Sequence, residues 1–136
     1  MAIVEEGIIK ENDGTLSFGD YKREDKLKVE NFESEGDIYK VRTHKDVTRL
    51  SKNSGLLLET VPGATVHSLK VESKLTSFDI EGNGSTQITI ELENDSNYAI
   101  YVDDVEIGHI KSNFSGKVSF SVELSENSQH VAVKKL

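Results

Sequence analysis

The side chains best suited to chemistry in this chain are its four histidines, His44, His67, His109 and His130. They are far apart in the sequence, and no HExxH or HxH motif places two of them on one metal ion. A metal site could still assemble across strands, but isolated histidines usually serve as single half-buried or surface groups. We therefore predict no metal site built on these residues.

Two acidic clusters occur at residues 91–95 and 103–106. Calcium binds where several oxygen ligands converge on one point, and neither cluster has the spacing of an EF-hand loop. The simpler interpretation is a solvated acidic surface that keeps the protein soluble. Calcium binding at residues 91–95 stays open as an alternative.

Motifs for nucleophilic catalysis or for phosphate binding are also missing. The chain has no cysteine and no GxSxG sequence, and the glycine-rich stretch at residues 82–85 lacks the GxGxxG pattern. Without cysteine, disulfides and thiolate zinc sites are excluded. We predict a protein that is not an enzyme and that uses no cofactor.

A shallow ligand site remains conceivable on a polar strand face. Sugar rings stack on exposed aromatic side chains, and this chain has no tryptophan, so Tyr101 is the best candidate for such a contact. Gln87 and Asp103 could add polar contacts. These three residues form our predicted ligand-contact set.

Segments with alternating apolar and polar residues fill the chain between residues 85 and 135, and they would have to position any such site. In one of them Val118 and Phe120 alternate with Ser119 and Ser121, and residues 86–92 and 98–102 show the same pattern. Side chains alternate between the two faces of a β-strand, so each segment predicts a strand with one buried and one solvated face.

Earlier parts of the chain also favour short strands. Residues 3–18 look like a hairpin around an Asp-Gly turn. Val47 and Leu50 have the three-residue spacing of one helical turn, which we expect within 46–53. In total we predict about eleven to thirteen short strands and little helix. The predicted fold is an all-β antiparallel β-sandwich of the jelly-roll or Ig-like kind.

Length and charge limit the domain organisation and the partners. The 136 residues suit a single domain, 1–136, with Pro62 as the one candidate boundary between N-terminal hairpins (1–62) and a C-terminal sandwich (63–136). The formal net charge is −8, which disfavours nucleic acid and anionic membranes as partners. We expect no signal peptide and no transmembrane segment. The cellular location is left unknown, with a spore or cell surface as the hypothesis and the cytoplasm as the alternative.

Three stretches carry a resemblance to known proteins, namely GTLSFGDY (Gly14–Tyr21), VPGATV (Val61–Val66) and YAIYVDDVEIG (Tyr98–Gly108). The last of these, with residues 113–124, resembles the closing hairpins of bacterial β-sandwich modules found at the ends of secreted polysaccharide-acting proteins. Together they make the chain similar to a group of small all-β proteins of anaerobic Gram-positive bacteria, some of which are labelled "endosialidase". The resemblance implies a β-sandwich that acts as a module associated with such enzymes.

Two functions fit these observations. The first is a non-catalytic structural protein of a bacterial cell or spore surface that assembles into a homo-oligomer, polymer or filament. Its subunits would be joined by strand pairing through the apolar N-terminal residues Ile3, Val4, Ile8 and Ile9. The alternative is a carbohydrate-binding module that uses Tyr101 to contact a polysaccharide. Whether the N-terminal strand pairs within its own chain or with a neighbour is left open.

Overall fold

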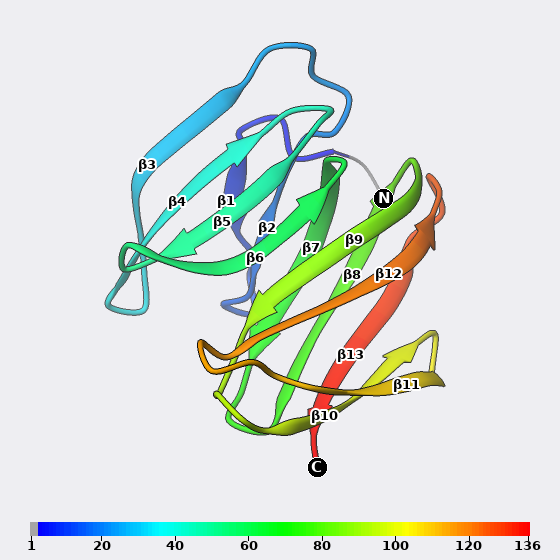
Figure 1. Ribbon diagram of the computed structural model, residues 1–136. Coiled ribbons are helices and arrows are strands. Elements are labelled where there is room, and N and C mark those ends of the chain that lie inside the picture. Colours follow the sequence, from blue (N-terminus) through cyan, green and yellow to red (C-terminus); the bar gives the residue numbers. More distant parts are fainter. Residues whose placement is uncertain (1–2) are drawn as a thin grey trace.

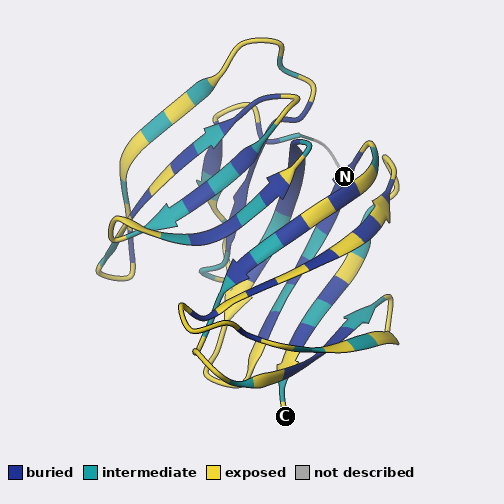
Figure 2. Cartoon of the chain, viewed as in Figure 1, coloured by how far each residue is buried: buried dark blue, intermediate teal, exposed yellow. Residues whose placement is uncertain are grey.

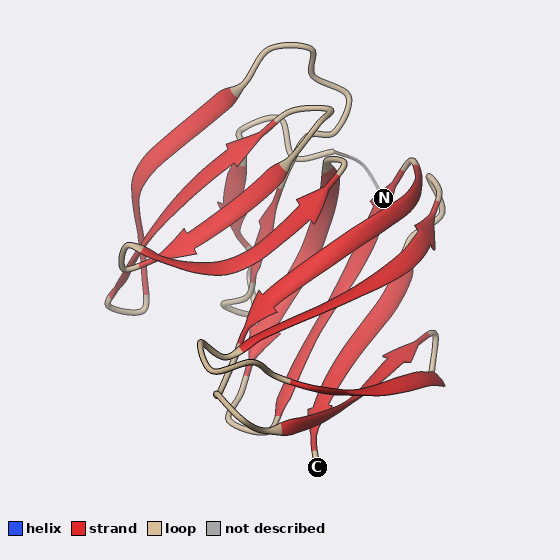
Figure 3. Ribbon diagram, viewed as in Figure 1, coloured by secondary structure: helices blue, strands red, loops and turns tan. Residues whose placement is uncertain are grey.

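Two antiparallel β-sheets stacked face to face form the whole structure (Figure 1). The computed structural model describes residues 3–136, in which there are 13 strands and no helix (Figure 3). The predicted all-β antiparallel sandwich is confirmed, and the strand count lies at the upper end of the expected range.

The first sheet has seven strands, in the order β1 (Ile8–Lys10), β2 (Leu16–Phe18), β7 (Ala64–Val71), β8 (Leu75–Gly82), β13 (Gln129–Lys135), β10 (Asn97–Val102) and β11 (Val105–Lys111). The second sheet has six strands, in the order β12 (Lys117–Leu124), β9 (Gly84–Glu91), β6 (Gly55–Val61), β5 (Thr48–Lys52), β4 (Asp37–Thr43) and β3 (Leu27–Ser34).

The chain crosses between the sheets at several points, and both halves of the sequence contribute to both sheets. In the first sheet, β2 pairs with β7 across the Pro62 position, with Leu16 opposite Leu69. In the second sheet, β6 pairs with β9, with Leu58 opposite Ile90. The predicted hairpin at residues 3–18 is confirmed, since β1 pairs with β2 and Ile8 lies opposite Phe18.

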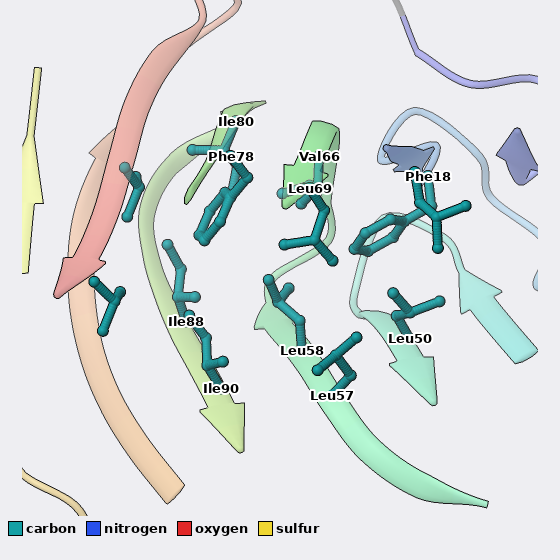
Figure 4. Close-up of a cluster of buried hydrophobic side chains, with 14 of the residues drawn as sticks. Phe18, Leu50, Leu57, Leu58, Val66, Leu69, Phe78, Ile80, Ile88 and Ile90 are labelled. Atoms are coloured by element: carbon teal, nitrogen blue, oxygen red, sulfur yellow. The ribbon is translucent and has the colours of Figure 1, made fainter. Parts of the chain in front are cut away.

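Alternation along the strands builds the core, as Figure 2 shows for both sheets. Strand β12 is the most regular example, because its residues alternate strictly between exposed and buried from Lys117 to Leu124. Each large apolar side chain removed from water in this way contributes about 1.5–3 kcal/mol. Figure 4 shows the two inner faces meeting, with side chains of the second sheet packed against side chains of the first: Leu50, Leu57, Leu58, Ile88, Ile90, Phe18, Val66, Leu69, Phe78 and Ile80.

The helical turn expected within residues 46–53 is wrong, because residues 48–52 form β5. The spacing of Val47 and Leu50 was misleading. It is Thr48 and Leu50 that share the buried face, at the period of two of a strand. The segment ends in a tight turn in which Asn53 and Ser54 both have positive φ, and β6 returns beside β5.

Two other local features shape the β10–β11 hairpin. Asp103 and Asp104 have φ values of 48° and 66°, and Val102 pairs with Val105 across them, so they form the two-residue turn of the β10–β11 hairpin. Gly108 lies opposite Ile100, next to an irregularity in the pairing of the same hairpin.

A buried hydroxyl group joins the two sheets at the end where β6 leads into β7. The Thr48 Oγ1 atom donates to the Ala64 carbonyl oxygen at 2.8 Å and accepts from the Ala64 backbone N–H at 3.1 Å. It also lies 2.8 Å from the Thr43 hydroxyl, which accepts a bond from the backbone N–H of Asp20. Thr43 and Thr48 are both fully buried, so these bonds satisfy polar groups that water cannot reach.

The same junction requires glycine at two positions. A Cβ atom at Gly63 would lie 2.0 Å from the carbonyl oxygen of His44, and one at Gly19 would lie 2.3 Å from that of Ala64. Gly19 also has a φ of 103°, which L side chains rarely adopt. The backbones therefore meet more closely here than any residue with a side chain would permit.

We predict that Thr48→Val lowers the free energy of unfolding by about 1–3 kcal/mol, because it keeps the shape but leaves the buried Ala64 amide and carbonyl without partners. Urea unfolding measures this change. Thr89→Val is the matched control, since the Thr89 hydroxyl bonds that of Ser119 on the solvated side of the second sheet. Equal stability of the two variants would contradict the role given to Thr48.

Candidate functional site

The edge strands of the two sheets have backbone N–H and C=O groups without a neighbouring strand, and such groups can bind another chain. The first sheet ends at β1 and β11, and the second ends at β12 and β3. Strand β11 differs from every other strand within residues 3–136, because none of its seven residues is buried. It is the mostly yellow strand at the lower right of Figure 2.

Strand β11 exposes apolar side chains as well as a backbone edge. Val105 is 63% exposed and Ile107 is 49% exposed. Ile110, near the other end of the strand, packs against the core and anchors it. Natural edge strands are usually protected by charges, prolines or covering loops, and an edge with exposed apolar residues is a template for pairing with another chain.

The predicted N-terminal residues lie against their own domain. Val4 and Ile8 are buried, and the Val4 backbone N–H donates to the Gly19 carbonyl at 3.0 Å. Ile3 and Ile9 are half-buried. Of the four predicted assembly residues, only Ile3 and Ile9 thus retain exposed surface.

The structure does not bring the predicted ligand-contact residues together. Gln87 is exposed on the outer side of the second sheet, in β9. Tyr101 is half-buried in β10 of the first sheet, next to Ala132 of β13 and Glu106 of β11. The Asp103 side chain is already bonded within the fold, because its Oδ1 atom accepts a hydrogen bond from the His130 backbone N–H at 2.8 Å.

Each histidine lies beside a different carboxylate. His67 Nε2 is 3.2 Å from Glu81, His130 Nδ1 is 2.8 Å from Asp79, and His44 Nδ1 is 3.8 Å from Asp46. His109 contacts Glu106 within the exposed strand β11. Within residues 3–136 no three histidine, aspartate or glutamate side chains converge as metal ligands.

Glu81 is the most buried carboxylate of the described chain and belongs to a network that the sequence did not indicate. It is 2% exposed and accepts a hydrogen bond from the hydroxyl of Tyr21 at 3.0 Å while it contacts His67. Burial and this bond to Glu81 raise the pKa of Tyr21 to about 12. The network fixes the segment that follows β2 onto the first sheet.

Comparisons with known proteins find no match to a family model, to a curated protein or to a solved structure. None of the described residues forms a helix long and apolar enough to cross a membrane.

We predict that Tyr21→Phe lowers the free energy of unfolding at neutral pH by about 1–3 kcal/mol, because Glu81 loses a buried partner. The folded state favours the protonated phenol, so the contribution of Tyr21 is complete below pH 10 and is lost as the pH rises through about 12.

Urea unfolding of both proteins from neutral pH to pH 12 checks this prediction. The stability difference between them should shrink above pH 10. Tyr101→Phe, at a half-exposed tyrosine, is the control and should leave stability nearly unchanged. A difference that stays constant across the alkaline range would contradict the assignment to the Tyr21 phenol.

Proposed function

We propose that this protein is a non-catalytic structural domain that assembles with copies of itself, and that the β10–β11 hairpin is the joining element. The observation that carries this proposal is the edge strand β11, which has no buried residue and exposes Val105 and Ile107. In the monomer Val105 stays 63% exposed and Ile107 49% exposed, whereas a contact between subunits would remove them from water.

The joining element therefore differs from the N-terminal segment that the sequence favoured. Val4 and Ile8 already stabilise their own domain, so using them between subunits would require them to leave the core. Each of these buried side chains contributes about 1.5–3 kcal/mol to the stability of its own domain. Moving the N-terminal segment to another subunit would first lose that contribution. Strand β11 needs no such rearrangement.

The distribution of reactive groups supports a role without catalysis. The four histidines are paired with four separate carboxylates on different strands and loops. Acid–base catalysis needs two or more such groups directed at one point where a substrate can lie. Tyr101 and Gln87 lie on opposite outer sides of the sandwich, so a shared sugar site between them has no support either.

We predict that Val105→Lys combined with Ile107→Lys keeps the protein monomeric. A contact that buries these positions would have to desolvate two ammonium groups, and we expect the concentration at which half the protein is assembled to rise at least about tenfold. Sedimentation velocity over a concentration series and negative-stain microscopy measure this effect.

Two control variants make the test specific. Leu136→Lys replaces another exposed apolar residue, 62% exposed, and should leave assembly unchanged. Ile9→Lys tests the N-terminal strand and should also leave assembly unchanged. Assembly that is lost in Ile9→Lys but kept in the β11 variant would transfer the joining role to β1. A wild-type protein that stays monomeric at every concentration would refute self-assembly.

A further inference from the structure

Three cationic residues from three strands lie side by side on the outer face of the second sheet. The strand register pairs Lys28 of β3 with Arg42 of β4, and Arg42 with Arg49 of β5. Neighbouring strands are about 4.8 Å apart, so the three side chains start within about 10 Å of one another. We call Lys28, Arg42 and Arg49, together with Lys40 of β4, the cationic row.

Three of the four residues of the cationic row line a depression in the protein surface. A hollow of about 330 Å³ is lined by Lys40, Arg42, Arg49 and Ser51. The Nε atom of Arg42 is buried and has no hydrogen-bond partner among the described residues. A guanidinium group normally uses its N–H donors on carboxylates or other oxyanions. No side-chain hydrogen bond or ion pair joins the Arg42 guanidinium group to another described residue, so its outer nitrogens are the donors left for an oxyanion in the hollow.

Carboxylates of the same chain neutralise only part of the row. Arg49 Nη1 bonds Glu59 at 2.9 Å, and Lys40 lies 3.5 Å from Glu30. Neither Lys28 nor Arg42 forms an ion pair with another described residue. Like charges directly opposite each other on paired strands lower stability. The row is the more unusual because the whole chain has a net charge of −8, and an anionic partner would relieve the repulsion.

We propose that the cationic row receives the acidic turn of the β10–β11 hairpin, formed by Asp103, Asp104 and Glu106, from a second copy of the chain. This inference rests on the self-assembly proposed above and names the surface that accepts the joining hairpin. Of these three carboxylates, that of Asp104 is exposed and accepts no hydrogen bond within the described chain, whereas Asp103 bonds His130 and Glu106 contacts His109. Asp104 is therefore the one most available to Arg42. Pairs of arginine and carboxylate groups form strong, directional contacts.

The two surfaces also match in their apolar parts. Ile38 lies on the same face of β4 as Lys40 and Arg42 and is 48% exposed. It offers an apolar neighbour to Val105 and Ile107, the two exposed residues beside the acidic turn. Because Val105 and Glu106 point to opposite faces of β11, one contact can cover the carboxylates and the apolar side chains only if the hairpin tip enters end on, with both of its faces against the second copy.

The two surfaces lie at opposite ends of the sandwich, so they cannot meet within one molecule. Strand β11 ends the first sheet where it contacts β12, whereas β3 ends the second sheet at the other side, where it contacts β1. In Figure 1 the β10–β11 hairpin is at the lower right and β3–β5 are at the upper left. A contact between unlike surfaces repeats from one copy to the next and produces open chains or rings.

Charge reversal on each surface tests the inference. The acceptor variant carries Lys28→Glu and Arg42→Glu, which break no ion pair of the folded chain and place a carboxylate opposite Arg49. The donor variant carries Asp104→Asn and Glu106→Lys, and asparagine suits the positive φ of position 104. We expect each variant alone to require at least about tenfold more protein for half-assembly than the wild type, measured by sedimentation velocity at low salt.

Mixing the two variants supplies the decisive result. In an equimolar mixture the turn that carries Glu106→Lys faces the carboxylates introduced into the row of the acceptor variant. The unchanged acidic turn of the acceptor variant faces the unchanged cationic row of the donor variant. The mixture should therefore form alternating chains at concentrations near those of the wild type. About 0.5 M salt should weaken assembly of both the mixture and the wild type, because the screening length falls to a few ångströms.

The outcomes distinguish failure of the cationic row as the acceptor surface from failure of self-assembly itself. Lys74→Glu with Lys134→Glu is the control, since it changes the net charge equally on the first sheet and should leave assembly unchanged. If the wild type assembles and the acceptor and donor variants assemble equally well, the cationic row is not the acceptor, although self-assembly stands. If the acceptor variant fails and the mixture does not recover, the row serves another anion and the inference is overturned. If the wild type never assembles, the proposed function itself fails.

Discussion

The contact on which the rest of the sandwich depends is the bond between the Thr48 hydroxyl and the backbone of Ala64. It lies where the chain leaves the second sheet and enters the first. One side chain there both donates to and accepts from the partner strand. Because Gly19 and Gly63 let the backbones come so close, the spacing of the sheets at this end is set by backbone and hydroxyl groups instead of large apolar side chains. The apolar core then fills the distance that this junction defines.

Much of this architecture was predictable, because a strand with one buried and one solvated face has apolar and polar residues in strict alternation. The strict alternation from Lys117 to Leu124 is an example, and the Asp103-Asp104 turn is another, since few residues tolerate positive φ. Thr48 was harder to predict. Val47 and Leu50 have a spacing that also fits a helix, and no residue type around Thr48 shows that its hydroxyl bonds to a second sheet.

The surfaces that we propose to join subunits were less predictable for a different reason. Lys28, Arg42 and Arg49 are neighbours only through the register of three strands, and a list of residues in chain order does not show it. Nor could the burial of the N-terminal apolar residues be predicted from their type. Ile8 and Ile9 are identical in chemistry, yet one is buried opposite Phe18 and the other is half-exposed. Burial depends on which face the pleat gives each residue.

The position of β13 between β8 and β10 has a consequence for how such a protein is made. Strand β13 follows all the other strands in the sequence, and it attaches the β10–β11 hairpin to its sheet. Strands β3, β4 and β5, in contrast, are consecutive hairpin partners near the start of the chain and can pair while translation continues. The β3–β5 part of the second sheet can therefore form before the β10–β11 hairpin is attached to the first sheet.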